Sequence, residues 1–506
     1  MTETAVQERP THEQEADHFD VLIVGAGISG IGSAYHLKEQ CPWASFAILD
    51  AFDSFGGTWV THRYPGVRSD SDLYTFGYRF KPWKGAPIAT GEEILRYMGE
   101  VIAENDLARH IRYRHRIDRA SWSSAEKRWT IEATEIAPGA TEGGTARRFT
   151  ANFLWMCQGY YRHAKGYTPE WPGMADFTGP IVHPQTWPAD LDLKGKRVVV
   201  IGSGATAATL VPAIAEETAH VTLLQRSPTY FIPGLNQNEL ADLLRVLEVD
   251  ENWVHEIVRR NILHNQEVLV RRAQEEPEAV KAELLEAARA YLGPDFDIAK
   301  HFTPRYRPWQ QRLAFIPDGD LFRGIAAGKA SVVTDEIDRF TATGIRLKSG
   351  EELPADVIIT ATGFELSPRG DIDFVVDGRP VDYAETVTYR GMMNTGVPNM
   401  VWIMGYFRAS WTLRVDLVGD FVCRLLNHMR AIGARQVEVA LRPEDAGMAL
   451  KPWIEGDDFS PGYLMRGLHL MPRSGDKPEW RHNQDYWQER RELPAIDIED
   501  AAFRYS

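Results

Sequence analysis

The stretch Phe19-Asp-Val-Leu-Ile-Val-Gly25-Ala-Gly27-Ile-Ser-Gly30 decides the fold of this chain. A short apolar run, typical of a buried strand, leads into three glycines with the spacing GxGxxG, and residues that suit a helix follow. Such glycines allow a tight turn, close approach of the backbone to a pyrophosphate, and close packing of the helix on the strand. The order of strand, turn and helix predicts a nucleotide-binding unit.

A carboxylate completes this first site. The next apolar segment, Phe46-Ala-Ile-Leu-Asp50, ends in an acid at the distance from Gly30 where a side chain accepts hydrogen bonds from ribose hydroxyls. Gly57, Thr58 and Trp59 follow, and the glycine lets the backbone press against a cofactor. A glycine-rich turn without a ligand is the alternative, but the strand, glycines, helix and spaced acid together favour a dinucleotide with a free ribose.

A second unit of the same kind lies far downstream. The apolar run Arg197-Val-Val-Val-Ile leads into Gly202-Ser-Gly204-Ala-Thr-Ala207, the variant of the motif that ends in alanine. The strand after it ends in Gln225, Arg226 and Ser227 in place of an acid. Loss of the carboxylate and gain of a guanidinium suit a 2′-phosphate, which arginine meets with two parallel hydrogen bonds. An exposed arginine beside an ordinary NADH site is the alternative.

The two sites together predict FAD and NADPH, and therefore a flavoprotein with two doubly wound, Rossmann-like α/β domains. We expect a discontinuous FAD-binding domain over residues 1–160 and 370–506, and an NADPH-binding domain over residues 161–369. Glutamate, arginine, leucine and alanine dominate residues 234–300. This pattern predicts a helical insert with solvated charged faces within the NADPH-binding domain.

Composition excludes several classes. The chain has 506 residues, is 44% hydrophobic and carries a formal net charge of −15, which argues against binding to nucleic acid or anionic membranes. No apolar run reaches the ~18–20 residues of a membrane span, and the polar segment 1–17 lacks the apolar region of a signal peptide. The three cysteines form neither a CxxC pair nor a metal cage, so we expect no metal and a reducing, cytoplasmic setting. These cysteines are Cys41, Cys157 and Cys423.

A third motif, Phe177-Thr-Gly179-Pro-Ile-Val-His183-Pro-Gln-Thr-Trp187-Pro188, lies between the two nucleotide sites. It resembles the fingerprint FxGxxxHxxxW(P/D) of the Baeyer–Villiger monooxygenases, and every fixed position is present. The sister family of heteroatom-oxidising flavin monooxygenases has Tyr or Phe at the position of Trp187. The resemblance extends over nearly the whole chain and is greatest to the ethionamide-activating branch. The motifs that indicate this branch are Arg63-Tyr-Pro-Gly, Ser69-Asp-Ser-Asp72, Ala361-Thr-Gly363 and Ala409-Ser-Trp-Thr412.

By chemistry alone, His183 would be a linker histidine that holds a turn through a backbone hydrogen bond, and Trp187 a packing residue. The resemblance assigns the fingerprint to the connection between the domains. We therefore expect Phe177, Gly179, His183 and Trp187 to couple rotation of the NADPH-binding domain to the flavin site, without taking part in bond chemistry.

The resemblance also implies a mechanism. NADPH reduces FAD, the reduced flavin forms a C4a-peroxyflavin with dioxygen, and this species converts a ketone to an ester or lactone. In the family an arginine stabilises the deprotonated peroxide and is paired with an aspartate of the first domain. The matching positions are Arg312 and Asp70. A fixed cation suits an anion in a dry site; from the residues alone, a simple salt bridge or a solvated surface loop would be the alternative.

One position departs from the family pattern. Many members carry a lysine directly before the arginine, where it contacts the 2′-phosphate of NADPH, but Gln311 stands here. The preference for NADPH then depends on Arg226 and Ser227, and is expected to be weaker than is usual in the family.

The expected partners are dioxygen and a small ketone or sulfide. The nearest alternative is S- or N-oxygenation of thioethers, thioamides or amines by hydroperoxyflavin at the same site. A pyridine nucleotide–disulfide reductase would need a CxxC pair, and a non-enzymatic flavin scaffold would need no Arg312. The sequence leaves open the oligomeric state and any peripheral membrane contact of the insert.

Overall fold

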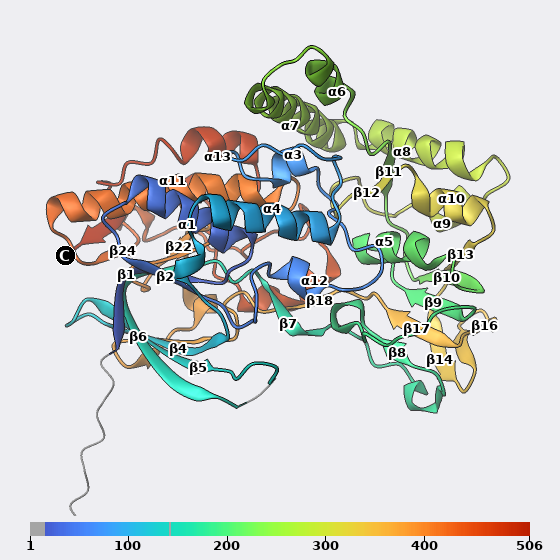
Figure 1. The fold of residues 1–506 in the computed structure, drawn as a ribbon, viewed down its shortest axis with the longest axis horizontal. Helices are drawn as coiled ribbons and strands as arrows, with labels where there is room; N and C mark the ends of the chain where they lie inside the picture. The colour runs from blue at the N-terminus through green and yellow to red at the C-terminus, as the bar shows by residue number, and fades with distance from the viewer. Residues whose placement is uncertain (1–15, 141–142) are drawn as a thin grey trace, which may run out of the picture.

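The computed structural model describes residues 16–140 and 143–506, so the predicted N-terminal polar segment lies almost wholly outside the described residues. Two α/β units lie side by side (Figure 1). A nine-stranded sheet and its helices form the first unit, and a five-stranded sheet forms the second. The prediction of two Rossmann-like α/β units is confirmed.

The first unit is built around β1, which pairs in parallel with β2 and β6. Val21, Leu22 and Ile23 of β1 are fully buried, as an apolar strand between two covered faces requires. The strands of this sheet are β1 (Asp17–Val24), β2 (Phe46–Leu49), β3 (Ile111–Arg112), β4 (His115–Ser123), β5 (Arg128–Glu135), β6 (Thr145–Met156), β19 (Asp373–Val376), β20 (Arg379–Pro380) and β23 (Met400–Trp402). Its long helices are α1 (Ile28–Gln40), α4 (Gly91–Glu104) and α11 (Trp411–Ile432), which cover one face (Figure 1), and α13 (Tyr486–Glu492) packs against α11.

The second unit is a parallel sheet in the order β13-β10-β9-β17-β8. Its strands are β8 (Ile181–Val182), β9 (Arg197–Ile201), β10 (His220–Gln225), β13 (Ala330–Thr334) and β17 (Val357–Thr360). The helices α5 (Ala205–Ile214) and α10 (Asp320–Ala326) pack on it, and a small antiparallel sheet of β14 (Ile337–Thr341), β15 (Gly344–Leu347) and β16 (Glu352–Pro354) adjoins it.

Two adjacent strands connect the units. The chain leaves the first unit through β7 (Tyr161–Gly166) and returns through β18 (Phe364–Leu366), and these strands pair antiparallel. The boundaries expected at 160/161 and 369/370 fall at or near these strands, and the assignment of one cofactor to each unit stays a prediction.

The segment between β11 (Phe231–Gly234) and β12 (Ala314–Pro317) is helical. It contains α6 (Glu239–Val246), α7 (Glu251–Glu275), α8 (Pro277–Leu292) and α9 (Ile298–His301), and the first two lie at the top of the view, above α3 (Figure 1). We call this segment the insert. Helix α7 packs against α3 (Leu73–Phe76) of the first unit, whereas α8 packs against α10 of the second. The insert therefore contacts both units.

The remaining elements are short. They are α2 (Thr58–Thr61), α3 (Leu73–Phe76), α12 (Gly462–Gly467), β21 (Thr388–Tyr389), β22 (Met393–Asn394), β24 (Val437–Val439) and β25 (Phe503–Tyr505). Single 3-10 turns cover Ala108–His110, Met174–Asp176, Pro184–Thr186, Tyr383–Glu385, Pro443–Asp445, Leu468–Leu470 and Pro478–Trp480. Within residues 16–140 and 143–506, every helix falls short of the length and apolarity that a bilayer crossing requires.

A fully buried ion pair joins α11 to α13 in the first unit. The guanidinium of Arg414 donates to both carboxylate oxygens of Glu489, at 2.9 and 3.1 Å, and the two side chains are 0% and 1% exposed. Arg414 also donates to the backbone oxygen of Met404, and the hydroxyl of Tyr406 donates to Glu489. Because every charge is paired and hydrogen-bonded, loss of one partner would leave an uncompensated buried charge.

We predict that Arg414→Met lowers the free energy of unfolding by about 3–5 kcal/mol, since Glu489 then stays buried without its cation. Urea-induced unfolding measures this change. The same substitution at Arg424, a half-buried residue of α11 that donates to backbone oxygens, is expected to cost about 1 kcal/mol. Equal costs at both positions would contradict the prediction.

Candidate active site

A deep cavity of about 1130 Å³ opens between the carboxyl ends of the strands of both sheets. This is where α/β sheets bind their ligands. Both glycine turns contribute to its wall, through Gly25 and Gly27 on one side and Gly202 and Gly204 on the other. Its volume exceeds the roughly 300–1,000 Å³ of a pocket for one ligand. The cavity is therefore larger than a single small ligand requires, and both glycine turns open into it.

The first glycine turn has the close backbone contacts that its motif predicts. Gly25 has a φ of +99°, and a Cβ on Gly30 would lie 1.8 Å from the carbonyl oxygen of Gly25. Gly57, with a φ of +54°, approaches so closely that its Cβ would lie 3.2 Å from the Cα of Gly27. No side chain caps the N-terminus of α1. Its N–H groups are thus available to a pyrophosphate, so these residues fit the group that the sequence predicts.

Asp50 lies at the end of β2 in the wall of the cavity. Its carboxylate accepts hydrogen bonds from the N–H groups of Ala26, at 2.6 Å, and Phe52, at 2.8 Å. Burial raises the pKa of Asp50 to about 6, although these two hydrogen bonds act to lower it. Donors on a bound ribose would favour the ionised form further.

Thr58 and Trp59, on α2, also line the cavity. The hydroxyl groups of Thr58 and Tyr161 are hydrogen-bonded at 2.5 Å. Because Tyr161 begins β7, this contact joins the first site to the strand that leaves for the second unit.

The second glycine turn is similar. Gly202 has a φ of +131°, and its Cβ would lie 2.2 Å from the carbonyl oxygen of Ala361. Gly204 faces open space, and α5 begins there without a side-chain cap. Ala207 is fully buried, as expected for the position that packs helix on strand.

The last residue of β10 and the two residues after it lie in two different environments. Gln225 is buried, and its amide donates to the carbonyl oxygen of His301 and the hydroxyl of Thr334 at 2.6 and 2.9 Å. Arg226 and Ser227 are exposed and line the cavity, as does Gln311. Arg226 has no ion-pair partner in the part of the chain that the structure describes. Its guanidinium is therefore a free cation beside the second turn.

Arg312 and Asp70 form a bidentate pair in the cavity. Nε of Arg312 lies 2.6 Å from Oδ2 of Asp70, and Nη2 donates to Oδ1 at 2.8 Å and to the hydroxyl of Ser71 at 3.0 Å. Both side chains keep an accessible part, 37% for Arg312 and 30% for Asp70, and both residues line the cavity. The pair joins the second unit to the first.

The surroundings of Arg312 keep it charged. Burial by itself lowers the pKa of the guanidinium, but the charge of Asp70 and the hydroxyls of Tyr160 and Tyr463 outweigh it, so the pKa is raised. The rings of Tyr160 and Tyr463 are neighbours, with centroids 6.0 Å apart, and burial raises the pKa of both hydroxyls. Sequence reasoning missed these tyrosines because no short-range motif marks them. Trp411 also lines the cavity and stacks on Tyr160 with centroids 5.2 Å apart.

The fingerprint residues lie outside this cavity, around the connecting strands. His183 Nε2 bonds to the carbonyl oxygen of Gly363 at 3.1 Å, and Nδ1 accepts from the N–H of Gln185 at 3.1 Å. A Cβ on Gly166 of β7 would lie 2.0 Å from the His183 ring. His183 thus holds both connecting strands together.

The other three fingerprint residues pack locally. Phe177 belongs to the core of the second unit, and Trp187 packs against that unit from a half-buried position. A Cβ on Gly179 would lie 2.3 Å from the carbonyl oxygen of Asp356. Within the described residues, no three His, Cys, Asp or Glu side chains are arranged to hold a metal ion.

Comparison with known proteins agrees with this geometry. A family model described as flavin-binding monooxygenase-like matches residues 88–266, and one for an NAD(P)-binding Rossmann-like domain matches residues 23–82. The FAD-containing monooxygenase EthA of Mycobacterium tuberculosis is 46% identical over 97% of this chain and 98% of its own length. The probable FAD-binding monooxygenase AlmA of an Acinetobacter species is 42% identical over 96% of each chain.

Solved structures share the fold. A steroid monooxygenase bound to NADP superposes with a TM-score of 0.74 at 23% identity, covering 96% of this chain and 99% of the other. An open structure of cyclohexanone monooxygenase gives 0.73 at 19% identity, covering 97% and 100%.

Two dinucleotide turns and a paired arginine in one cavity define a flavin-dependent monooxygenase. The chain belongs to the family of FAD-containing monooxygenases that includes EthA. The predictions of a Baeyer–Villiger-type flavin monooxygenase fold and of an enzyme that uses FAD and NADPH are confirmed.

We predict that FAD binding to the apoprotein strengthens as the pH rises toward about 6 and then levels off, because the pKa of Asp50 is about 6 before binding. If ribose hydroxyls lower this pKa, FAD binding releases a proton below pH 6, and the dissociation constant falls by at most about tenfold per pH unit. Flavin fluorescence quenching measures it. Asp50→Asn should bind FAD more weakly and without this pH dependence; an unchanged slope in the variant would contradict the assignment.

Proposed function

We propose that this enzyme inserts one atom of dioxygen beside the carbonyl of a small ketone and so forms an ester or lactone. The observation that carries the proposal is the bidentate pair of Arg312 and Asp70 in a cavity lined by both dinucleotide turns. The fingerprint is complete and has Trp187 where the heteroatom-oxidising family has Tyr or Phe. It therefore supports the ketone reaction over oxygen transfer to sulfur or nitrogen.

Each turn would hold one cofactor. Bound FAD, once reduced by NADPH, would supply activated dioxygen. The residues proposed for FAD are Gly25, Gly27, Gly30, Asp50, Gly57, Thr58, Trp59 and Asp70, and those for NADPH are Gly202, Gly204, Ala207, Arg226 and Ser227.

Arg312 would stabilise the negative charge that develops on oxygen. Asp70 fixes the guanidinium by one hydrogen bond and one close ion-pair contact, and Nη1 has no partner within the described residues. Fixed donors of this kind lower a barrier by about 3–4 kcal/mol, because they need no reorganisation during the reaction. Asp70 would thus set the direction in which the free N–H groups point.

Transfer of oxygen to sulfur or nitrogen is the second candidate. Such transfer needs a protonated oxidant, and Tyr160 and Tyr463 lie beside Arg312 with pKa values raised by burial. Their hydroxyls therefore stay protonated and available as donors. Thioethers or thioamides would be the preferred substrates in that case.

The two units would act together. We propose that the first unit is the FAD-binding domain and the second, with its insert, the NADPH-binding domain. Phe177, Gly179, His183 and Trp187 would couple their movement, which the contacts of His183 with both connecting strands support. The buried free thiols of Cys41, Cys157 and Cys423 fit a cytoplasmic setting.

The mass of the product distinguishes the two reactions. The FAD-loaded enzyme is supplied with NADPH, ¹⁸O₂ and a mixture of linear ketones, aryl ketones and thioethers. We expect esters that carry one heavy oxygen. Sulfoxides alone would favour the second candidate, and hydrogen peroxide alone would contradict both.

In the same assay, Arg312→Ala should leave the reduction of FAD by NADPH intact and lower ester formation by about 10²–10³-fold, because one preorganised cation is lost. Arg305→Ala, which changes an exposed arginine of the same segment, is the matched control and should match the unchanged enzyme. Ester formation retained by Arg312→Ala would overturn the proposed role.

Arg226→Leu should raise KM for NADPH by about tenfold to a hundredfold and leave KM for NADH unchanged, because charge-assisted hydrogen bonds to the 2′-phosphate are lost. Steady-state kinetics with both nucleotides measure this. Arg346→Leu, in β15 away from the cavity, serves as the control. An equal loss with both nucleotides would mean that Arg226 does not contact the 2′-phosphate.

A further inference from the structure

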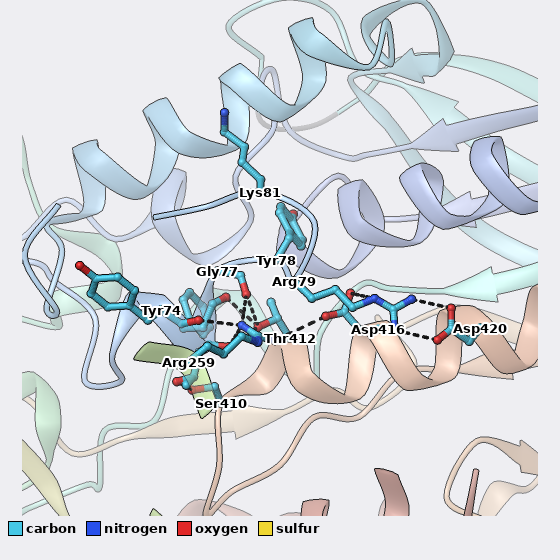
Figure 2. A network of polar contacts seen from close by, with 12 residues as sticks. Tyr74, Gly77, Tyr78, Arg79, Lys81, Arg259, Ser410, Thr412, Asp416 and Asp420 are labelled. Carbon is cyan, nitrogen blue, oxygen red and sulfur yellow. Dashed lines mark hydrogen bonds and ion pairs between the residues drawn. The ribbon is translucent and has the colours of Figure 1, made fainter. Parts of the chain in front are cut away.

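Arg259 of α7 is buried, although its helix belongs to the charge-rich insert. It is 6% exposed and lies against the first unit, with Nη1 donating to the carbonyl oxygens of Tyr74, Thr75 and Gly77 at 2.8, 3.1 and 3.0 Å. Nη2 lies 3.6 Å from a carboxylate oxygen of Asp416 on α11. Figure 2 shows this side chain between the loop that ends α3 and the first turns of α11.

These carbonyls belong to the short helix α3 and the residue after it. A helix leaves its last carbonyls without partners inside the helix, and a side-chain donor must supply them where water is excluded. Arg259 supplies Tyr74 and Thr75, and the hydroxyl of Thr412 donates to Phe76 at 2.7 Å. The C-terminal end of α3 is thus held by side chains from α7 and α11.

The other end of α3 leads directly to the oxygenation site. The side chain of Asp72 accepts from the N–H of Tyr74 at 2.7 Å and caps the helix. Asp70 and Ser71, which bind Arg312, are the two residues before this cap. The position of Asp70 therefore depends on α3, and α3 depends on Arg259.

Asp416 gives the buried cation a fixed counterion. It is 5% exposed and is also bonded to Nε2 of His36 at 2.8 Å. Arg79 and Asp420 extend the network toward solvent, through an ion pair of 2.6 Å (Figure 2). The arginine is thus anchored in α1 and α11, the long helices of the first unit.

The turn that carries Arg312 is held from the opposite side. Trp309 has a φ of +62°, a left-handed conformation that a bulky residue adopts only when its surroundings enforce it. Arg408, a residue of the first unit that is 6% exposed, donates to the carbonyl oxygen of Trp309 at 3.2 Å. The same guanidinium is bonded to Asp458 at 2.8 Å.

We propose that Arg259 and Arg408 are reciprocal positioning residues for oxygenation. Arg259, from the insert, holds the segment that presents Asp70, and Arg408, from the first unit, holds the turn that presents Arg312. Asp70 and Arg312 are thus each held in position by an arginine from the other part of the chain. The inference rests on the proposed function of the Arg312–Asp70 pair, and it makes the insert part of the oxygenation apparatus.

The test compares Arg259→Met with Arg260→Met in the FAD-loaded enzyme. Arg260 is the next residue of α7, and its side chain is 77% exposed. In Arg259→Met, NADPH should reduce FAD at a rate close to that of the unchanged enzyme. The oxygenated product formed per NADPH should fall by about tenfold to a hundredfold, since a misplaced group loses rate without losing binding. Hydrogen peroxide should rise in proportion, and Arg260→Met should show neither change.

Hydrogen–deuterium exchange supplies a readout independent of turnover. Peptides that cover Asp70–Gly77 should exchange faster in Arg259→Met, while β1 and β6 keep their protection. Arg259→Lys keeps a cation near Asp416. It should recover part of the product formed per NADPH and part of the protection from exchange. Arg408→Met should lower the product formed per NADPH in the same way, and peptides around Trp309 should exchange faster.

The inference would be overturned if Arg259→Met formed as much product per NADPH as the unchanged enzyme and its Asp70–Gly77 peptides exchanged at the unchanged rate. A loss of protection that extends through β1 and β6 would also overturn it, because the role would then be general stability. If the unchanged enzyme oxygenates none of the substrates supplied, the proposed function fails. The exchange over Asp70–Gly77 then decides alone whether Arg259 anchors α3.

Discussion

The site depends on one electrostatic contact, the ion pair between Arg312 and Asp70. The two residues lie 242 positions apart, and each belongs to a different sheet unit. A carboxylate and a guanidinium that meet through both carboxylate oxygens tolerate little change in distance or angle. The two units must therefore keep a definite relative position at this point, and much of the surrounding structure is arranged to provide it.

The two glycine turns position their parts of the site through contacts within one unit. Backbone contacts that no other residue would allow bring α1 and α5 close to their strands, so that both helix N-termini face one cavity. Elements within a few residues of each other achieve this, without help from the other unit. The paired charges, in contrast, need both units, the insert and the C-terminal segment.

This difference explains what the sequence could predict. Strand, glycine turn and spaced acid follow one another within thirty-odd residues, so both dinucleotide units and Asp50 were predictable from local pattern. Arg312 stands among other arginines, and only the family resemblance separated it from Arg305 and Arg307. Tyr160 and Tyr463 gave no pattern, because their proximity to Arg312 arises from tertiary packing. Arg259 does have a local sequence signal, because it lies four residues from both His255 and Leu263, which are buried on the same face of α7. A charge on the apolar stripe of an amphipathic helix indicates a buried partner.

The paired strands β7 and β18 have a consequence for how the chain folds. Tyr161 and Leu366 are neighbours in space, although about 200 residues separate them. The late strands β19, β20 and β23 must join a sheet whose other strands were synthesised much earlier. Once the intervening unit has folded, its two ends are held together, and the entropy of closing so long a loop is largely removed. Completion of the nine-stranded sheet is then comparable to adding strands across a short turn.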